Sequence, residues 1–372
     1  MSLTTQPTTI AFYLPQFHPI AFNDANWGPG FTEWTNVARA RPLFPGHFQP
    51  RLPGALGFYD LRCSEVIEEQ ANYARAYGVD AFCFYYYRFG PQRLLDRPLE
   101  AFLSHPEIRM PFMYCWANEP WTRAWDGRSG ETLIQQTYDE VTLNGLTEDL
   151  GRAMVDERYL RVNGKPLFLI YQIEHVPKAA EFVENLRARL REKLDLDILI
   201  GAVFSHGFKS EMMNWLDCVV QFPPHRIPRT PESRVIVPTE QLAVTDPDRS
   251  DYFEPYESVI AACLRHARDV PQMCLGVCPD WDNSPRRRRE AHVLLGSTPD
   301  LFQAWTEDAV IETIKNYETG RTMAPLLFIN SWNEWGEGAM LEPSEKFGTA
   351  YLEAFQAGLS AGIKRSSSFD KS

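Results

Sequence analysis

The chain has 372 residues, of which 44% are hydrophobic and 13% aromatic, and this is enough to bury a large core. It carries 37 basic and 49 acidic residues, so a net charge of −12 makes nucleic acid and anionic membrane surfaces poor partners. Residues 1–9 contain no hydrophobic signal region and no apolar run approaches a membrane span, which predicts a soluble, cytoplasmic protein.

Short apolar runs alternate with amphipathic stretches along most of the chain. Eight runs are predicted as buried strands: Thr9–Leu14, Val79–Tyr87, Pro111–Trp116, Pro166–Tyr171, Ile198–Phe204, Cys218–Phe222, Cys274–Cys278 and Leu326–Ser331. Helical spacing is found in Cys63–Tyr77, Val176–Leu194, Tyr256–Val270, Thr298–Tyr317 and Gly348–Ile363. Thr298 and Pro299 are a typical helix cap and first position. Shorter helices are expected before residue 110 and near residue 210.

Strands that alternate with helices pair in parallel, and eight such units favour an α/β fold with a single closed (β/α)8 TIM barrel. A doubly wound sheet remains an alternative at this level. The barrel is predicted to span residues 9–363, between a flexible N-terminus (1–8) and a polar, serine-rich tail (364–372) that we expect to be disordered. Two long loops, Phe17–Tyr59 and Pro223–Pro255, are expected to be ordered walls of a cleft.

The seven cysteines are interpreted as buried thiols, because their number is odd and several lie in apolar runs. Cys274 and Cys278 have no matching Cys or His pair nearby, so we expect no metal site and no cofactor. Polar side chains follow the predicted strands at their C-terminal ends, the face that carries the active site in such barrels.

The segment Ser331–Gly338 reads SWNEWGEG and directly follows the last predicted strand. Gly336 and Gly338 disfavour a regular helix. Glu334 and Glu337 are therefore expected to share one cleft, where repulsion and burial separate their pKa values into a proton donor and a base. Such a pair is the usual equipment for cleaving a glycosidic bond. A charged loop after a core strand is the alternative interpretation.

A second motif, Cys115–Gly127, reads CWANEPWTRAWDG. Its tryptophans suit stacking on sugar rings, and its amide and acids suit binding of hydroxyls; a capped loop with packed aromatics is the alternative. The candidate substrate-binding residues here are Trp116, Asn118, Glu119, Trp121, Trp125 and Asp126, and Glu119 is also a candidate catalytic carboxylate.

Further candidates are less specific. Glu33 and Trp34 could contact substrate or begin a helix, and His18 and His225 could bind a sugar hydroxyl or be structural. The run Arg286–Arg289 could hold phosphate, but a solvated charged turn is favoured. The predicted substrate-binding set is completed by Tyr13, Tyr171, Trp281, Asp282, Asn283, Trp332, Asn333 and Trp335.

Five motifs in order resemble one known group: AFYLPQFH from Ala11, WGPGFTEW from Trp27, WANE from Trp116, WDN from Trp281 and WNEWGEG from Trp332. They are similar to the WbsX-like family, often described as lipopolysaccharide biosynthesis proteins or glycosyltransferases. That family is related to glycoside hydrolase family 99, the endo-α-mannosidases. The resemblance covers residues 9–360.

The resemblance implies a (β/α)8 barrel and a reaction that retains anomeric configuration. It implies that Glu334 is the base on the sugar 2-hydroxyl, which forms a 1,2-anhydro sugar, and that Glu337 is the acid and then the base for water. We accordingly expect a raised pKa for Glu337 and an ionised Glu334. Gly336 stands where the hydrolases have His, a departure that puts the mannosidase subsite in question.

The sequence therefore predicts a glycoside hydrolase acting on a bacterial surface polysaccharide or oligosaccharide. A glycosyltransferase or transglycosylase of lipopolysaccharide or O-antigen assembly is the first alternative, as the description of the family suggests. Asp280 and Asp282 have the spacing of a nucleotide-sugar metal site, but so short a pattern is weak and no nucleotide-binding fold surrounds it. A non-catalytic carbohydrate-binding barrel is the second. The sugar, the linkage and the oligomeric state are left open.

Overall fold

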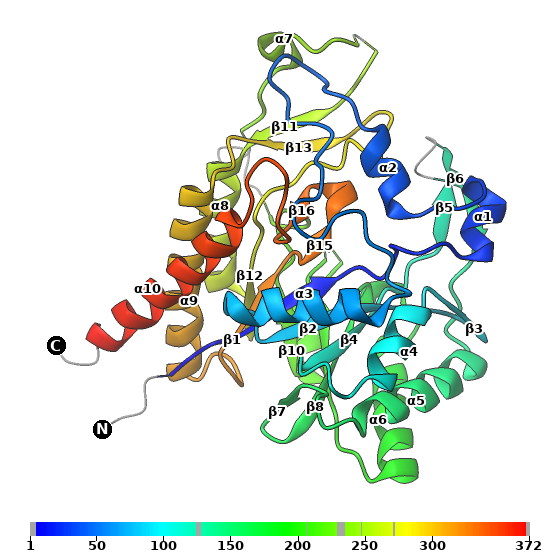
Figure 1. Cartoon of the computed structure of the whole chain (residues 1–372). Coiled ribbons are helices and arrows are strands. Elements are labelled where there is room, and N and C mark those ends of the chain that lie inside the picture. The colour runs from blue at the N-terminus through cyan, green and yellow to red at the C-terminus, as the bar shows by residue number, and fades with distance from the viewer. Residues whose placement is uncertain are drawn as a thin grey trace.

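The computed structural model describes residues 5–123, 128–205, 207–228, 235–246, 248–270 and 272–369. At its centre lies a closed barrel of eight parallel strands (Figure 1). The strands are β1 (Thr8–Tyr13), β2 (Ala81–Phe89), β4 (Phe112–Trp116), β8 (Lys165–Ile170), β9 (Leu199–Val203), β10 (Cys218–Val220), β12 (Met273–Val277) and β14 (Leu326–Ile329). Because β1 pairs with both β2 and β14, the sheet has no open edge. The eight predicted strands and the TIM barrel are confirmed, and the doubly wound sheet is excluded.

Helices surround the barrel (Figure 1). They are α3 (Ser64–Ala76), α4 (Arg97–Ser104), α5 (Glu140–Met154), α6 (Ala179–Leu194), α8 (Tyr256–Asp269), α9 (Pro299–Glu318) and α10 (Ala350–Phe369). The start of α9 is as predicted, because the Thr298 side chain accepts a hydrogen bond of 3.2 Å from the backbone N–H of Leu301. The fifth and sixth barrel strands are joined by a 3-10 turn, Ser210–Asn214, near the short helix expected there.

Helix α5 was not predicted from spacing, since Gly145, Gly151 and two threonines lower its intrinsic helix propensity. Tertiary packing explains one of these glycines. A Cβ atom at position 145 would lie 2.2 Å from Nη1 of Arg88. The helix is capped by Asp139, whose side chain accepts a hydrogen bond from the backbone N–H of Thr142.

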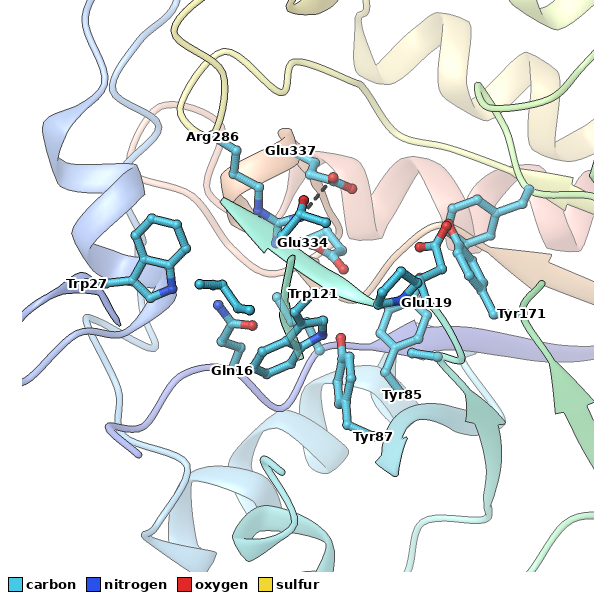
Figure 2. A pocket seen from close by; sticks show the side chains of 16 residues that line it. Gln16, Trp27, Tyr85, Tyr87, Glu119, Trp121, Tyr171, Arg286, Glu334 and Glu337 are labelled. Carbon is cyan, nitrogen blue, oxygen red and sulfur yellow. Dashed lines mark hydrogen bonds and ion pairs between the residues drawn. The ribbon is translucent and has the colours of Figure 1, made fainter. Parts of the chain in front are cut away.

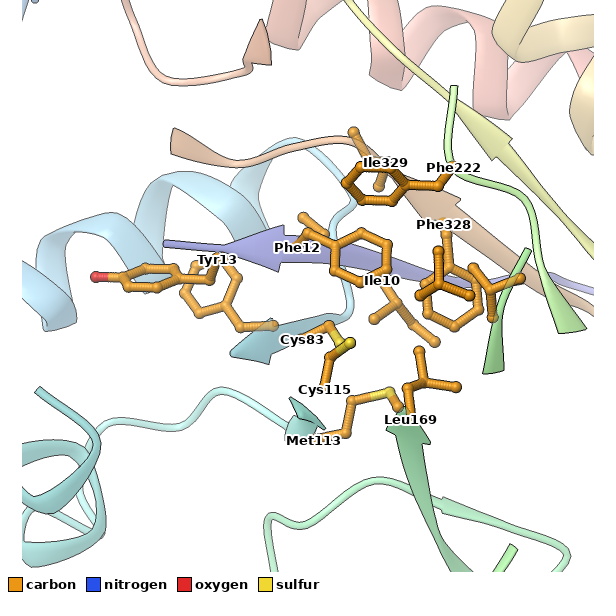
Figure 3. Close-up of a cluster of buried hydrophobic side chains, with 14 of the residues drawn as sticks. Ile10, Phe12, Tyr13, Cys83, Met113, Cys115, Leu169, Phe222, Phe328 and Ile329 are labelled. Atoms are coloured by element: carbon orange, nitrogen blue, oxygen red, sulfur yellow. The ribbon is translucent and has the colours of Figure 1, made fainter. Parts of the chain in front are cut away.

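The barrel interior is filled by aromatic and aliphatic side chains (Figure 3). The ring of Phe12 lies at centroid distances of 5.6 Å from Tyr85, 5.0 Å from Phe222 and 5.7 Å from Phe328. Six of the seven cysteines are buried as expected, but Cys63 is exposed because it precedes the first turn of α3 at the surface. The floor of the site described below is therefore a packed aromatic layer.

The tail predicted to be disordered from residue 364 instead continues α10 as far as Phe369. Ser366 and Ser367 donate hydrogen bonds to the carbonyl oxygens of Gly362 and Ile363, and Arg365 pairs with Glu307 of α9 at 2.6 Å. These contacts hold a polar sequence in helical form. Residues 1–4 and 370–372 lie outside the described residues.

The long loops and several short elements gather around the C-terminal ends of the barrel strands, and both loops contain regular structure within their described residues. The first holds α1 (Ala21–Trp27) and α2 (Glu33–Arg39); the second holds α7 (Thr239–Leu242) and β11 (Tyr252–Pro255), which pairs with β13 (His292–Leu295). The remaining elements at this end are β3 (Gln92–Leu94), β5 (Trp121–Arg123), β6 (Arg128–Ile134), β15 (Asn333–Glu334) and β16 (Ala339–Met340). Strand β7 (Arg161–Val162) pairs with the first residues of β8, at the opposite end of the barrel. Within the described ranges, no helix is long and apolar enough to cross a bilayer.

Candidate active site

A cavity of ≈ 250 Å³ lies at the C-terminal ends of the barrel strands (Figure 2). Its polar side chains come from loops after different strands, as expected for an active site in this architecture. The lining consists of Leu14, Gln16, Trp27, Tyr85, Tyr87, Ala117, Glu119, Pro120, Trp121, Thr122, Leu133, Tyr171, Phe222, Arg286, Glu334 and Glu337. Charged groups and aromatic faces thus share one small space.

The hairpin after β14 carries the two candidate carboxylates. Strands β15 and β16 pair antiparallel, and the 3-10 turn Trp335–Glu337 joins them, followed by Gly338 at a φ of 67°. The hydroxyl of Ser331 accepts a hydrogen bond of 2.9 Å from the backbone N–H of Glu334 and donates one of 2.7 Å to the carbonyl oxygen of Ala339. Backbone and side-chain bonds together place Glu334 and Glu337 at the cavity.

Arg286 ion-pairs with three carboxylates at once. Its Nη2 lies 2.7 Å from Glu334, its Nη1 lies 2.8 Å from Glu337, and its Nε lies 2.7 Å from Glu33. Figure 2 shows the guanidinium and the pair on one side of the cavity, across from Tyr85 and Tyr87. Since one positive charge faces three carboxyl groups, their full ionisation would leave an excess of negative charge in a buried site.

Burial raises the pKa of Glu334 to about 8, against the lowering effect of Arg286 and with a further rise caused by Glu337 and Glu33. Burial also raises the pKa of Glu337 above its ordinary value. The direction for Glu337 agrees with the raised pKa expected of it, whereas the raised pKa of Glu334 differs from the expectation that this carboxyl group stays ionised. The physical reason is depth, because the Glu334 side chain is 6% exposed and that of Glu337 is 21% exposed. The pair retains a proton at neutral pH.

Aromatic rings form much of the remaining wall. Trp121 on β5 packs edge-on against Tyr87, with ring centroids 5.4 Å apart. The guanidinium of Arg226 lies 4.7 Å above the ring of Tyr171. Trp27 and Tyr171 lie at opposite ends of the cavity (Figure 2). These flat apolar faces, next to carboxylates and amides, suit a ligand with both C–H faces and hydroxyls.

Five of the predicted site residues line this cavity: Glu119, Trp121, Tyr171, Glu334 and Glu337. Glu119 accepts a hydrogen bond from Nε2 of Gln172 and lies 3.7 Å from Arg226. Trp125 and Asp126 lie outside the described residues.

Two predicted amides connect backbone segments instead of lining the cavity. Asn333 accepts a hydrogen bond of 2.7 Å from the N–H of Leu14 and donates one of 3.1 Å to its carbonyl oxygen. Asn118 makes the same two-point contact with the backbone of Gln172, with both distances 2.8 Å. Each amide thereby joins the ends of neighbouring strands and shapes the cavity indirectly.

Several predicted aromatic residues are buried behind the cavity as a scaffold. Trp34 packs against Trp335 with ring centroids 5.6 Å apart, and the indole N–H of Trp335 donates to Glu342 at 2.6 Å. The Tyr13 hydroxyl donates to Gln70, which in turn donates to Glu342. Burial raises the pKa of Glu342 to about 7 despite these donors. Trp116 and Trp332 are also fully buried.

The other predicted residues lie apart from the main cavity. His18 is buried, with Nδ1 2.9 Å from the carbonyl oxygen of Pro15, and burial lowers its pKa. Asp282 is fully buried in an ionic cluster with the first loop. His225 and Asn283 line a second cavity of ≈ 600 Å³, and Trp281 is buried edge-on against His225.

Seven lining residues with aromatic or polar side chains were not among the predicted site residues: Gln16, Trp27, Tyr85, Tyr87, Thr122, Phe222 and Arg286. Tyr85 and Tyr87 could have been found, because alternate residues of a strand face the same side. Trp27 lies in the conspicuous segment Trp27–Gly30. Arg286 was placed in a solvated turn, an interpretation that holds only for its exposed neighbours Arg287, Arg288 and Arg289. Among the described residues, no cluster of three His, Cys, Asp or Glu side chains could hold a metal ion.

Sequence comparisons match nearly the whole chain. A family model described as glycosyltransferase WbsX matches residues 9–355. The chain is 40% identical over 357 residues to an uncharacterized protein named WxcX from Xanthomonas campestris pv. campestris strain B100. It is 39% identical over 363 residues to WxcX from strain ATCC 33913 of the same pathovar. Each match covers 96% of this chain and 50% of the relative, so the chain spans about half the length of these curated relatives.

Solved structures share the fold. A GH99 endo-alpha-mannosidase from Bacteroides thetaiotaomicron is similar at a TM-score of 0.58 and 16% identity, over 98% of this chain and 100% of that one. A glycoside hydrolase-like protein is similar at a TM-score of 0.61 and 11% identity, over 96% of this chain and 95% of that one. At such identities the likeness concerns the fold alone.

Proposed function

This chain belongs to the family described as glycosyltransferase WbsX, and we propose that it cleaves glycosidic bonds in a bacterial surface polysaccharide or oligosaccharide. The observation that carries the proposal is the carboxyl pair of Glu334 and Glu337, held by one guanidinium in a cavity with aromatic walls. Glycoside hydrolysis requires a proton donor and a base on either side of one bond.

The burial of the pair supports a catalytic role over a purely binding role. Two buried carboxyl groups beside a third acid cost desolvation energy that a neutral, hydrogen-bonding amide would avoid. A sugar-binding barrel has no need of that cost. A raised pKa is what lets a carboxyl group donate a proton near neutral pH.

In the proposed reaction Glu337 is the acid, the role that the match to the family motif implies, and its side chain is the more exposed of the pair, at 21% against 6% for Glu334. Glu334 takes the proton of the sugar 2-hydroxyl as that oxygen bonds to the anomeric carbon. The anomeric carbon releases the leaving oxygen, which takes the proton of Glu337. The product of this step is a 1,2-anhydro sugar.

Water completes the cycle with retention of configuration. Glu337, now ionised, takes a proton from water as the water oxygen attacks the anomeric carbon. The bond from that carbon to the 2-oxygen breaks, and Glu334 returns its proton to this oxygen. Both carboxyl groups end as they began. In the state that reacts Glu334 is ionised, so substrate binding must move the shared proton onto Glu337.

The transfer of a sugar from a nucleotide donor is the second candidate function, and the family's description favours it. The acidic pair with the spacing of a nucleotide-sugar metal site has other partners here. Asp280 ion-pairs with Arg51 at 2.7 Å, and Asp282 lies 2.9 Å from His47. Because both carboxylates already have protein partners, these contacts support hydrolysis over transfer from a nucleotide sugar bound at Asp280 and Asp282.

A panel of bacterial surface glycans tests the proposal. Each glycan is incubated with the protein in buffer containing a chelator, with and without nucleotide sugars, and products are followed by mass spectrometry. We expect shorter glycans in plain buffer and none with Glu337→Gln. Product that requires a nucleotide sugar would establish transfer instead, and binding without product would establish a binding barrel.

A further inference from the structure

We propose that Arg286 is a positioning residue for the Glu334–Glu337 pair and that Glu33 anchors Arg286. Gly336, which has no side chain, leaves the space in the turn through which the Glu33 carboxylate reaches Arg286. We call Glu33, Arg286 and Gly336 the clamp. The inference deepens the proposed function and rests on it for the meaning of the pair. The clamp itself is a geometric arrangement that can be measured without any substrate.

The guanidinium contacts a different carboxylate with each of its three nitrogens. Nε is directed to Glu33, Nη2 to Glu334 and Nη1 to Glu337, at 2.7 to 2.8 Å. A planar guanidinium fixes the directions of these bonds relative to one another, whereas a lysine ammonium would act as a single point of charge. The spacing of the two carboxyl groups of the pair is therefore set by Arg286.

Glu33 is suited to be the anchor, because it is fully buried and does not line the cavity. One carboxylate oxygen accepts from Arg286, and the other accepts from Nε2 of Gln16 at 3.3 Å. The backbone N–H of Glu33 donates to the carbonyl oxygen of Gln16 at 3.1 Å. Glu33 thus joins the first loop to the loops that carry Arg286 and the pair.

Gly336 makes this contact possible. A Cβ atom at position 336 would lie 1.8 Å from Oε1 of Glu33 and 2.8 Å from Nε of Arg286. The backbone of Gly336 is not among those with positive φ, so its conformation does not demand glycine. Glycine is required at position 336 by packing, because the carboxylate of Glu33 occupies the volume that a side chain at this position would fill.

The clamp members act on the pair with opposite charges. Arg286 stabilises the ionised forms of Glu334 and Glu337, and Glu33 destabilises them. The other ionisable groups that face the pair are Arg287, Tyr85, Tyr87, Tyr171 and Cys278. Burial raises the pKa of the three hydroxyls and of the thiol, so these groups are neutral at about pH 5 to 9. Arg287 adds a positive charge that the variants below leave in place.

The first test is the pH dependence of glycan cleavage. Glu33→Gln should move both limbs of the kcat/KM profile to lower pH, by roughly one unit, and Arg286→Ala should move both to higher pH, by roughly one to three units. Guanidinium ion in the buffer should restore activity to Arg286→Ala. The variant Arg286→Lys should have less activity than Arg286→Ala recovers with guanidinium. Lower activity with unmoved limbs in both variants would overturn the clamp.

A second test needs no activity. The carboxyl carbons of ¹³C-labelled glutamate are titrated by NMR, with Glu334→Gln and Glu337→Gln used to assign the two signals. The pKa values of the pair should fall in Glu33→Gln and rise in Arg286→Ala. Unchanged titrations beside normal glycan cleavage would overturn the clamp and leave the proposed function standing. Shifted titrations without cleavage of any glycan would support the clamp and contradict the proposed function.

A double-mutant cycle tests the gap at Gly336. Gly336→Ala should reduce kcat at least tenfold, whereas adding it to Glu33→Ala should cost less than threefold, because the carboxylate at 1.8 Å is gone and Arg286, no longer bonded to Glu33, can shift to relieve the remaining contact of 2.8 Å. Gly130→Ala is the control, since a Cβ at that exposed position meets nothing within 4 Å. If Gly336→Ala does not fold, the double variant must recover folding. Additive losses, or a double variant that also fails to fold, would overturn this part of the inference.

Discussion

The backbone N–H of Asp282 donates a hydrogen bond of 2.6 Å to the carbonyl oxygen of Glu337. Asp282 does not line the cavity, yet it holds the turn that carries the candidate acid. Its side chain accepts from Gln49 at 2.5 Å, lies 2.9 Å from His47 and lies 3.7 Å from Arg51. The first loop, the loop after β12 and the turn after β14 are thereby joined behind the site.

Asp282→Asn should destabilise the protein. Burial by itself would raise the pKa of Asp282, but His47 and Arg51 outweigh it and hold the pKa well below its usual range. The resulting stability is present above the unfolded pKa of about 3.9 and is lost as pH falls toward the folded pKa. We expect a loss of roughly 3–5 kcal/mol at neutral pH in urea unfolding, the range for a broken buried pair.

This loss should shrink below about pH 4, where protonation begins to remove the same interaction from the native protein. Glu68→Gln, at an exposed position on α3, is the control and should change stability by less than about 0.5 kcal/mol. A loss that is equally large at neutral and at strongly acid pH would show that the charge of Asp282 is not the cause.

Glu334→Gln and Glu337→Gln should each lower kcat by roughly 10²–10⁴, the usual contribution of a general acid or base. Both should still bind glycan, which calorimetry can measure. Glu119→Gln is the matched control, because Glu119 lines the same cavity and contacts Gln172 and Arg226 instead. We expect that variant to change KM more than kcat.

A substrate whose 2-hydroxyl is replaced by hydrogen tests the role of Glu334. The proposed step requires the 2-oxygen as nucleophile, so this analogue should bind without turnover. Mass spectrometry of the intact protein after incubation with a 2-fluoro sugar is the measurement that could contradict this role of Glu334. A sugar bound covalently to Glu334 would identify that carboxylate as a conventional nucleophile.

Glu334→Gln should become progressively more stable than the native protein as pH rises. The folded pKa of Glu334 is about 8, and the unfolded value is about 4.3. In this window the folded protein binds a proton that the unfolded chain releases, so native stability falls with rising pH. Melting temperatures at about pH 5 and about pH 8.5 measure the effect; a constant difference between variant and native protein would contradict it.

Trp121→Ala should weaken glycan binding while leaving kcat largely unchanged. Trp121 contributes an aromatic face to the cavity and contacts neither Glu334 nor Glu337 in the described hydrogen bonds and ring pairs. An aromatic contact of about 0.5–1.5 kcal/mol corresponds to a roughly 2- to 13-fold rise in KM. Trp121→Phe should recover part of it, and equal effects of both changes would argue against stacking.

The strands, most of the helices and the family were predictable because local patterns determine them. Each barrel strand is a short apolar run, and the cap at Thr298 needs only its own neighbours. The family model confirms the membership predicted from the motifs. The placement of Glu334 and Glu337 at one cavity also followed from the sequence, because three residues of chain after a buried strand cannot separate them far.

The tertiary structure alone decided which polar residues face the cavity. Asn118 and Asn333 satisfy backbone groups of distant segments, so their amides are not available to a ligand. Arg286 is indistinguishable in sequence from the three arginines that follow it. Only the meeting of three loops brings Glu33 to it, in the space that Gly336 leaves. Such contacts depend on the packing of segments some 50 to 250 residues apart, and no local pattern encodes them.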